Sequence, residues 1–103
     1  MTIMVREVMK VLPGKMAEAK EVEKREFAIW DRLGLNIVVK HYLPFACQGD
    51  RMHTLVYQTE FDSLAAIEAL GKKIGPDPEM PAVAAEWDKV LESRIVEFYT
   101  VLD

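Results

Sequence analysis

The stretch that decides the fold reads LNIVVKHYLPF at residues 35–45, ACQGDR at 46–51 and MHTLVYQTEF at 52–61. The two outer runs are rich in β-branched and aromatic residues, which favour strands. The polar segment between them contains Gly49 and Asp50. This pattern predicts a β-hairpin whose loop is longer than two residues. One helix-like segment precedes the hairpin and two follow it, so the rest of the chain is arranged around it.

Outside the hairpin, the periodicity of apolar residues predicts two further strands and three helices. Pro13 and Gly14 end the first strand, and Gly34 ends the first helix,. Ser63 and Asp77 stand where they can cap the second and third helices,. The expected elements are a strand at 3–12, a helix at 15–33, the two hairpin strands, helices at 64–74 and from 78 to about 91, and a strand at 94–102.

The order of these elements is β-α-β-β-α(α)-β, which is the split β-α-β, ferredoxin-like plan. With 103 residues, the chain is expected to form a single α+β domain over residues 1–103,. The sheet is then four-stranded and antiparallel, with its helices on one face only.

Composition limits the functional class. The net charge is −4, and charges of both signs are spread along the chain, so we expect no nucleic-acid surface,. The only cysteine, Cys47, has no basic neighbour except Arg51, and we expect it to be unreactive,. The charged start lacks the pattern of a signal peptide, and the apolar runs are too short to span a membrane. We therefore expect a cytoplasmic protein.

Both faces of the predicted sheet carry apolar residues. Odd positions of the hairpin are strongly apolar, and even positions keep Val38 and Val56 near the strand centres,. Helices can cover only one face, and an apolar patch of this kind usually marks an interface. The sequence therefore predicts a homodimer that packs through the second sheet face.

Four polar residues share the odd parity and are the candidate site: Glu7, His41, His53 and Tyr57. If their face lines a cavity, they would orient a small ligand among apolar walls. A histidine could act as a general base, and Glu7 could orient it, so His41, His53 and Glu7 are the catalytic candidates. The alternative is that these groups only form hydrogen bonds within the fold or across the dimer.

Cofactor and metal motifs are weak. Glu7, His41 and His53 have the composition of a two-histidine, one-carboxylate iron site, but no close spacing supports one,. The chain has no nucleotide-binding loop and no nucleophile–base motif. We therefore predict no metal and no cofactor.

Two structural predictions concern the helices. Glu26 interrupts the apolar side of the first helix, and a buried charge requires a partner. Arg6 or Lys40 would supply it if the even face of the sheet meets the helices. Trp30 and Trp87 lie on apolar helical stripes, so we expect both to be core residues,.

Three segments carry a family resemblance: VREVMKVLPGK at 5–15, FDSLAAIEAL at 61–70, and the late helix that starts at DPE (77–79) and contains Trp87. With them, the chain resembles the dimeric α/β-barrel superfamily, and within it the NIPSNAP and antibiotic-biosynthesis-monooxygenase-like domains. The resemblance implies two ferredoxin-like subunits packed sheet to sheet around a shared barrel. It departs at Glu7, where NIPSNAP-like chains tend to have arginine.

The resemblance implies one of two functions, since members range from monooxygenases to proteins without known activity. The first is binding or oxidation of a small apolar organic ligand in a cavity between sheet and helices. The second is a non-catalytic homodimeric assembly module. A barrel filled by Met9, Phe45, Tyr57 and Tyr99 would favour the second, and an open pocket with convergent polar groups would favour the first.

Overall fold

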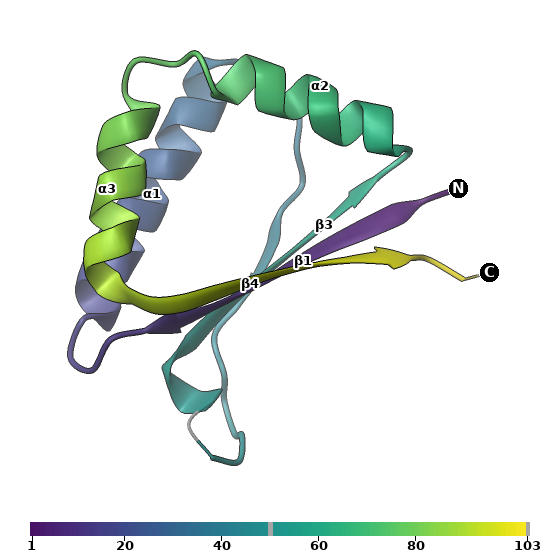
Figure 1. The fold of residues 1–103 in the computed structure, drawn as a ribbon. Coiled ribbons are helices and arrows are strands. Elements are labelled where there is room, and N and C mark those ends of the chain that lie inside the picture. Colours follow the sequence, from purple (N-terminus) through teal and green to yellow (C-terminus); the bar gives the residue numbers. More distant parts are fainter. Residues whose placement is uncertain (50, 103) are drawn as a thin grey trace.

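The computed structural model describes residues 1–49 and 51–102, so Asp50 of the predicted hairpin turn lies outside the described residues. Four antiparallel strands form one sheet in the order β2-β3-β1-β4, and three helices lie on one face of it (Figure 1). The predicted α+β, ferredoxin-like fold is therefore confirmed. The elements are β1 (Ile3–Val11), α1 (Met16–Arg32), β2 (Lys40–Tyr42), the 3-10 helix η1 (Arg51–His53), β3 (Thr54–Phe61), α2 (Leu64–Ile74), α3 (Met80–Val90) and β4 (Leu91–Thr100).

The helix ends follow from local sequence. Gly34 has a φ of 70°, the left-handed conformation that glycine adopts easily after a helix,. The Ser63 Oγ accepts the backbone N–H of Ala66 at 3.2 Å and so caps α2,. Asp77 accepts the backbone N–H of Glu79 at 3.0 Å, although α3 itself begins only at Met80.

The hairpin differs from the prediction in its first strand. Only the three residues of β2 pair with β3, whereas the sequence predicted a strand over 35–45. Residues 35–39 instead belong to the connection that leads from the end of α1 to β2 (Figure 1). The loop is also longer than expected, because it includes η1.

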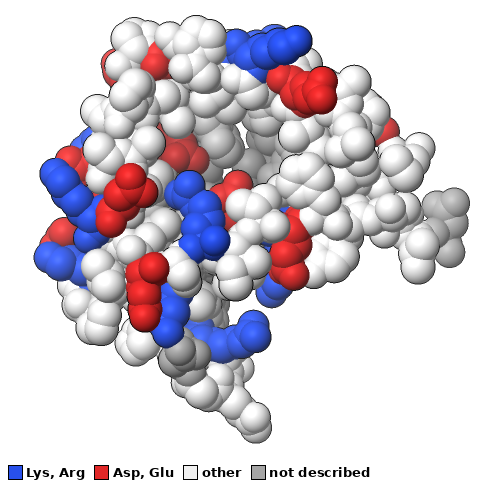
Figure 2. All heavy atoms as spheres, viewed as in Figure 1, with Lys and Arg blue, Asp and Glu red and all other residues white. Residues whose placement is uncertain are grey.

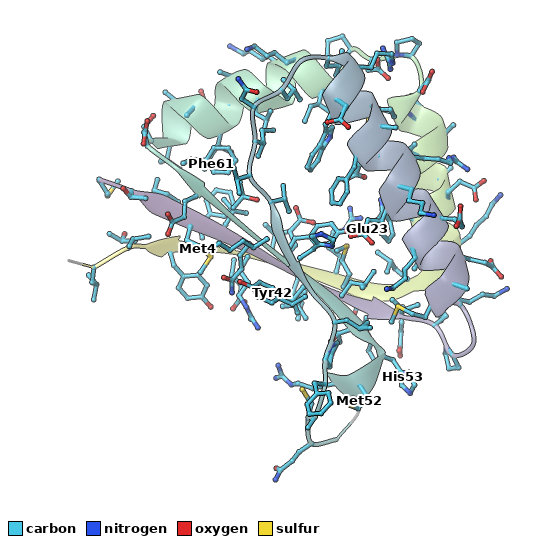
Figure 3. The ribbon with its side chains drawn as sticks, turned by 180° about the vertical axis from the view of Figure 1, so that it is seen from behind. Met4, Glu23, Tyr42, Met52, His53 and Phe61 are labelled. Atoms are coloured by element: carbon cyan, nitrogen blue, oxygen red, sulfur yellow. The ribbon has the colours of Figure 1, made fainter. Side chains whose placement is uncertain are left out.

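The two sheet faces have different surroundings. Odd residues of β1 face the helices, and Met9 and Val11 are among the most buried side chains of the protein. They pack with Ile29, Trp87 and other residues of α1 and α3 into the main core. Figure 3 places Phe61 on the α2 side of the sheet, and Met4 and Tyr42 on the other side. Parity alone could not decide which face the helices cover, and the structure assigns them to the odd face.

Candidate functional site

A cavity of about 420 Å³ lies between the odd face of the sheet and the helices α1 and α2. This volume falls within the range of about 300–1,000 Å³ that is typical of small-molecule sites. Figure 2 shows the surface hollowed between α2 and the sheet. Most of the wall is apolar, and its apolar residues are Val5, Ile37, Val39, Phe61, Ile67, Leu70, Ile74, Val96 and Phe98.

The cavity exists because α2 does not pack closely on the sheet. None of the residues of α2, each of which the structure describes, is fully buried. Ile67, Leu70 and Ile74 give the helix the apolar side that the sequence predicted, but this side lines the cavity. Val96 and Phe98 of β4 face the same space and remain 50% and 54% exposed. Apolar surfaces thus face one another across a space large enough for a ligand.

Three of the predicted site residues lie side by side across the sheet. Tyr57 of β3 pairs with Glu7 of β1 on one side and with His41 of β2 on the other. Because directly opposed residues in an antiparallel pair point to the same face, all three lie on the helix-covered side. Glu7 and Tyr57 line the cavity, whereas His41 lines a separate pocket with Phe27 and Val39.

The Tyr57 hydroxyl is buried and forms no hydrogen bond with any described residue. Burial raises the pKa of this phenol far above its usual value, and the nearby carboxylates of Glu23 and Glu26 raise it further,. Oε1 of Glu23 is likewise buried without a hydrogen bond to a described residue, and it is the acceptor to which the Tyr57 hydroxyl can donate. Tyr57 therefore stays protonated at physiological pH and keeps one O–H donor,.

His41 is joined to a carboxylate that the sequence did not assign to the site. Its Nδ1 lies 2.9 Å from Oε1 of Glu23, on the middle of α1. The histidine side chain is 57% exposed and the glutamate side chain only 10%. Figure 3 shows Glu23 between α1 and the sheet. The sequence analysis singled out Glu26 and not Glu23, and the position of Glu23 among apolar residues of the same helix was the signal that could have identified it.

Trp30 was expected to be a core residue, and it is partly buried against the core while also contributing to the cavity wall. Its indole Nε1 is buried and has no hydrogen-bond partner among the described residues. Its ring packs against Phe27 with centroids 5.3 Å apart, and Phe27 contacts Tyr57 at 5.8 Å. A buried tryptophan N–H usually has a partner, so this unpartnered donor is unusual,.

Glu26 has a different partner from the one that the sequence predicted. Its Oε2 accepts the Trp87 Nε1–H at 2.8 Å. Arg6 instead pairs with Glu97 at 3.2 Å on the opposite sheet face, and Lys40 also has even parity, so the proposed pairing was wrong. The assumption that failed was that the even face meets the helices. Burial raises the pKa of Glu26, while the Trp87 hydrogen bond opposes the rise,.

Arg94 of β4 is the cation nearest to this group of acids. Its Nε lies 3.9 Å from Oε2 of Glu7, and its guanidinium lies 5.9 Å from the centre of the Trp87 ring. Its charge lowers the pKa of Glu26, although burial of that carboxyl dominates. Of these charged groups, only Glu7 lines the cavity, and Arg94 lies beside it.

His53 is separated from the other candidates. It lies in η1, before β3 begins, is exposed, and is not among the residues that line the cavity. Figure 3 shows it at the far end of the hairpin. The 3-10 turn interrupts the strand alternation, so odd parity did not carry over to this residue.

Among the described residues, no group of three or more His, Cys, Asp and Glu side chains could hold a metal ion. The helices within the described ranges are too short or too polar to cross a membrane.

Comparison with known proteins identifies structural neighbours only. No protein-family model matches the chain, and no curated protein matches it. A NIPSNAP family protein from Agrobacterium tumefaciens superposes with a TM-score of 0.83 at 16% identity, over 99% of this chain and 87% of that one. The fold is that of a NIPSNAP protein. The predicted resemblance is thereby confirmed at the level of structure.

Two further neighbours bear on assembly and chemistry. A dimeric ferredoxin-like protein of unknown function from Bacteroides fragilis has a TM-score of 0.68 at 15% identity, over 97% of this chain and 96% of that one. SnoaB, a cofactor-independent oxygenase from Streptomyces nogalater, has a TM-score of 0.66 at 17% identity, over 99% of this chain and 94% of that one. The NIPSNAP-like fold is thus shared with an oxygenase and with a dimer.

Proposed function

We propose that this protein binds a small apolar organic ligand in the cavity between the sheet and helices α1 and α2. The observation that carries the proposal is the cavity itself, with its apolar walls and with Glu7 and Tyr57 at one end. Ligand sites have this character, with mostly apolar walls and few polar groups. Of the four residues that would fill a closed barrel, Met9 and Tyr57 are buried, and Phe45 and Tyr99 are exposed. It is the open cavity, with Glu7 and Tyr57 in its wall, that favours a ligand-binding protein over a purely structural one.

A matched pair of variants on α2 tests the proposal. Leu70 lines the cavity, whereas Leu64 on the same helix is 53% exposed and does not line it. A tryptophan at position 70 would fill the cavity, and one at position 64 would extend into solvent. With an uncharged naphthalene probe, we expect Leu70→Trp to lose at least roughly tenfold in affinity, equivalent to 1.4 kcal/mol. Leu64→Trp should bind like the wild type, and equal binding by both variants would refute the proposed site.

Oxidation of the bound ligand is a second candidate function, supported by the fold shared with SnoaB. Once a ligand is identified, oxygen consumption in a Clark-type cell would test it. Consumption that requires both protein and ligand, and that Leu70→Trp abolishes, would support an oxygenase. Ligand binding without oxygen uptake would leave the protein a binding module.

We also propose that the outer face of the sheet, meaning the face opposite the helices, joins two copies of this chain. Ile95, Tyr99 and Tyr42 on this face are each more than 40% exposed. Between them, Arg6 pairs with Glu97 at 3.2 Å and Lys10 with Glu92 at 3.3 Å, so charges within the face are already balanced. An apolar face with neutralised charges suits a second copy of itself.

Light scattering over a dilution series tests the dimer. We expect the wild type to have twice the monomer mass, and Ile95→Glu to shift it toward the monomer because a carboxylate would be buried at the interface. Naphthalene-probe binding by the same samples serves as the control for folding. A monomeric wild type at high concentration would contradict the proposal.

A further inference from the structure

Glu7 is the charged group that a ligand in the cavity would meet. Of the described residues that line the cavity, it is the only charged one. It stands within the sheet wall, because its strand partners Tyr57 and Val96 line the same cavity, as does Val5 on its own strand. The Glu7 side chain is 35% exposed, whereas the Tyr57 hydroxyl and the Trp30 indole nitrogen are buried. A ligand can therefore reach the Glu7 carboxylate directly.

The cation beside Glu7 leaves much of the carboxylate free to bind. Arg94 Nε lies 3.9 Å from Oε2 of Glu7, which is an ion pair too long for a hydrogen bond,. The Arg94 guanidinium is also held 5.9 Å from the centre of the Trp87 ring. A purely apolar ligand that filled the cavity would remove water from the carboxylate and replace it with no hydrogen bond, which is costly. The ligand should therefore carry a hydrogen-bond donor.

A second acid favours a charged donor over a neutral one. Burial raises the pKa of Glu26, the charge of Glu7 raises it as well, and the charge of Arg94 opposes the rise. One guanidinium thus acts on two carboxylates. A ligand ammonium would supply a second cation, and charge-assisted hydrogen bonds are roughly twice as strong as neutral ones. A ligand carboxylate would instead be repelled by Glu7.

We propose that the cavity binds an apolar ligand that carries one ammonium group, with the ammonium donating to the Glu7 carboxylate and the apolar body lying against α2. This inference rests on the proposed ligand-binding function and names the chemical class of that ligand.

Three naphthalene probes of similar size test the inference: 2-propylnaphthalene without a polar group, 2-naphthylethylammonium with a cation, and 2-naphthylacetate with a carboxylate. Dissociation constants are measured at pH 7.5 by displacement of a fluorescent probe. The wild type should bind the ammonium probe at least roughly tenfold more tightly than the carboxylate probe.

Glu7→Gln keeps the size of the side chain and removes its charge. It should weaken binding of the ammonium probe by roughly tenfold or more, and it should not weaken binding of the hydrocarbon. Glu68→Gln is the matched control, because Glu68 is exposed on α2 and does not line the cavity. It removes the same charge from the protein and should leave the binding of all three probes unchanged.

Arg94→Gln should act in the opposite direction. It removes the competing cation beside Glu7, so it should tighten binding of the ammonium probe by roughly twofold or more. Loss of folded protein cannot raise affinity, so a gain in this variant separates the effect of charge from structural damage. Urea melts of each variant exclude loss of folding.

The outcomes separate the two proposals. Three results would each overturn the ammonium inference alone: equal losses for the ammonium and hydrocarbon probes in Glu7→Gln, a carboxylate probe that binds as tightly as the ammonium probe, or no gain in Arg94→Gln. Binding of the hydrocarbon that Leu70→Trp removes would still support the proposed function. If none of the three probes binds, or if Leu70→Trp leaves their binding unchanged, both the function and the inference fall.

Discussion

The region between the sheet and the helices has two halves. Both are lined by apolar side chains, but only one half is closely packed. In the filled half, α1 and α3 cover the sheet around Met9 and Val11, and Val83, Trp87 and Val90 are each 2% exposed. In the hollow half, α2 crosses above the sheet with Ile67, Leu70 and Ile74 as cavity wall. Figure 1 shows α1 and α3 side by side, with α2 running away from them.

The difference shows how a small fold can combine a closely packed core with an open cavity. The filled half buries the large apolar side chains that hold the fold together. The hollow half gives up that stabilisation, because apolar walls that face an open space lose the contacts a packed core would supply. A ligand that fills the space would restore these contacts and stabilise the native state.

The largest effect should come from removing a side chain in the filled half. Met9 is 1% exposed, and Met9→Ala should lower the free energy of unfolding by about 2–5 kcal/mol, since it leaves a cavity in a packed core,. Leu70→Ala in the hollow half should cost less than about 2 kcal/mol, because that side chain is not fully buried. Urea melts measure both, and equal losses would mean that the two halves are equally packed.

The next effect in size tests the contact between the end of α1 and the turn that joins α2 to α3. Arg32 at the end of α1 donates to the buried carboxylate of Asp77, which precedes α3, at 2.6 Å. The guanidinium lowers the pKa of Asp77 below its ordinary value. The stability from this pair is therefore present above the ordinary pKa, near about 4, and is lost as the pH falls through the lowered folded value.

Asp77→Asn should accordingly be less stable than the wild type at pH 7, and the gap should shrink toward pH 2. Denaturant melts at pH 7, 5, 3 and 2 would measure the difference in the free energy of unfolding between Asp77→Asn and the wild type. Asp88→Asn is the matched control, because Asp88 is exposed on α3. A gap that stays constant with pH would show that Asp77 contributes as a turn residue and not through its charge.

A smaller effect concerns Glu26, a polar residue within the filled half. Burial raises the pKa of Glu26, so the native state disfavours its charged form. Stability linked to this group is fully present below the unfolded pKa and is lost as the pH rises through the folded value. Glu26→Gln keeps an oxygen for the Trp87 N–H and should equal or exceed the wild type by up to about 1 kcal/mol at pH 7.

The stability advantage of Glu26→Gln over the wild type should vanish near pH 4. Glu26→Leu serves as the control, since it removes the acceptor and should destabilise by about 1–3 kcal/mol. A clear loss of stability in Glu26→Gln at neutral pH would mean that the Glu26 charge itself stabilises the fold.

The smallest effect belongs to the hollow half. Gly71 of α2 lines the cavity, and a Cβ added there would meet no described atom within 4 Å. Gly71→Ala should raise stability by about 0.5 kcal/mol through higher helix propensity and should leave naphthalene-probe binding unchanged. Loss of binding together with the gain in stability would show that the cavity is tighter at this point than its walls indicate.

The sequence by itself determined the order of the elements, because the features that set them are local. Gly34 and Ser63 mark helix ends through their own backbone and hydroxyl chemistry. Strand alternation placed Glu7, Tyr57 and His41 on one face, since the pleat has a period of two wherever the strand is regular. It failed at His53, where a 3-10 turn interrupts the strand.

Tertiary structure decided what those local patterns left open. Both sheet faces are apolar enough to pack, so only the assembled fold shows that the odd face meets the helices and that Glu26 is bound by Trp87. An amphipathic helix has the same pattern whether it packs closely or lines a cavity, so the sequence could not distinguish α2 from α3. Whether the indole of Trp30 finds a partner depends on side chains distant in sequence, and that distance is why the site emerged only in three dimensions.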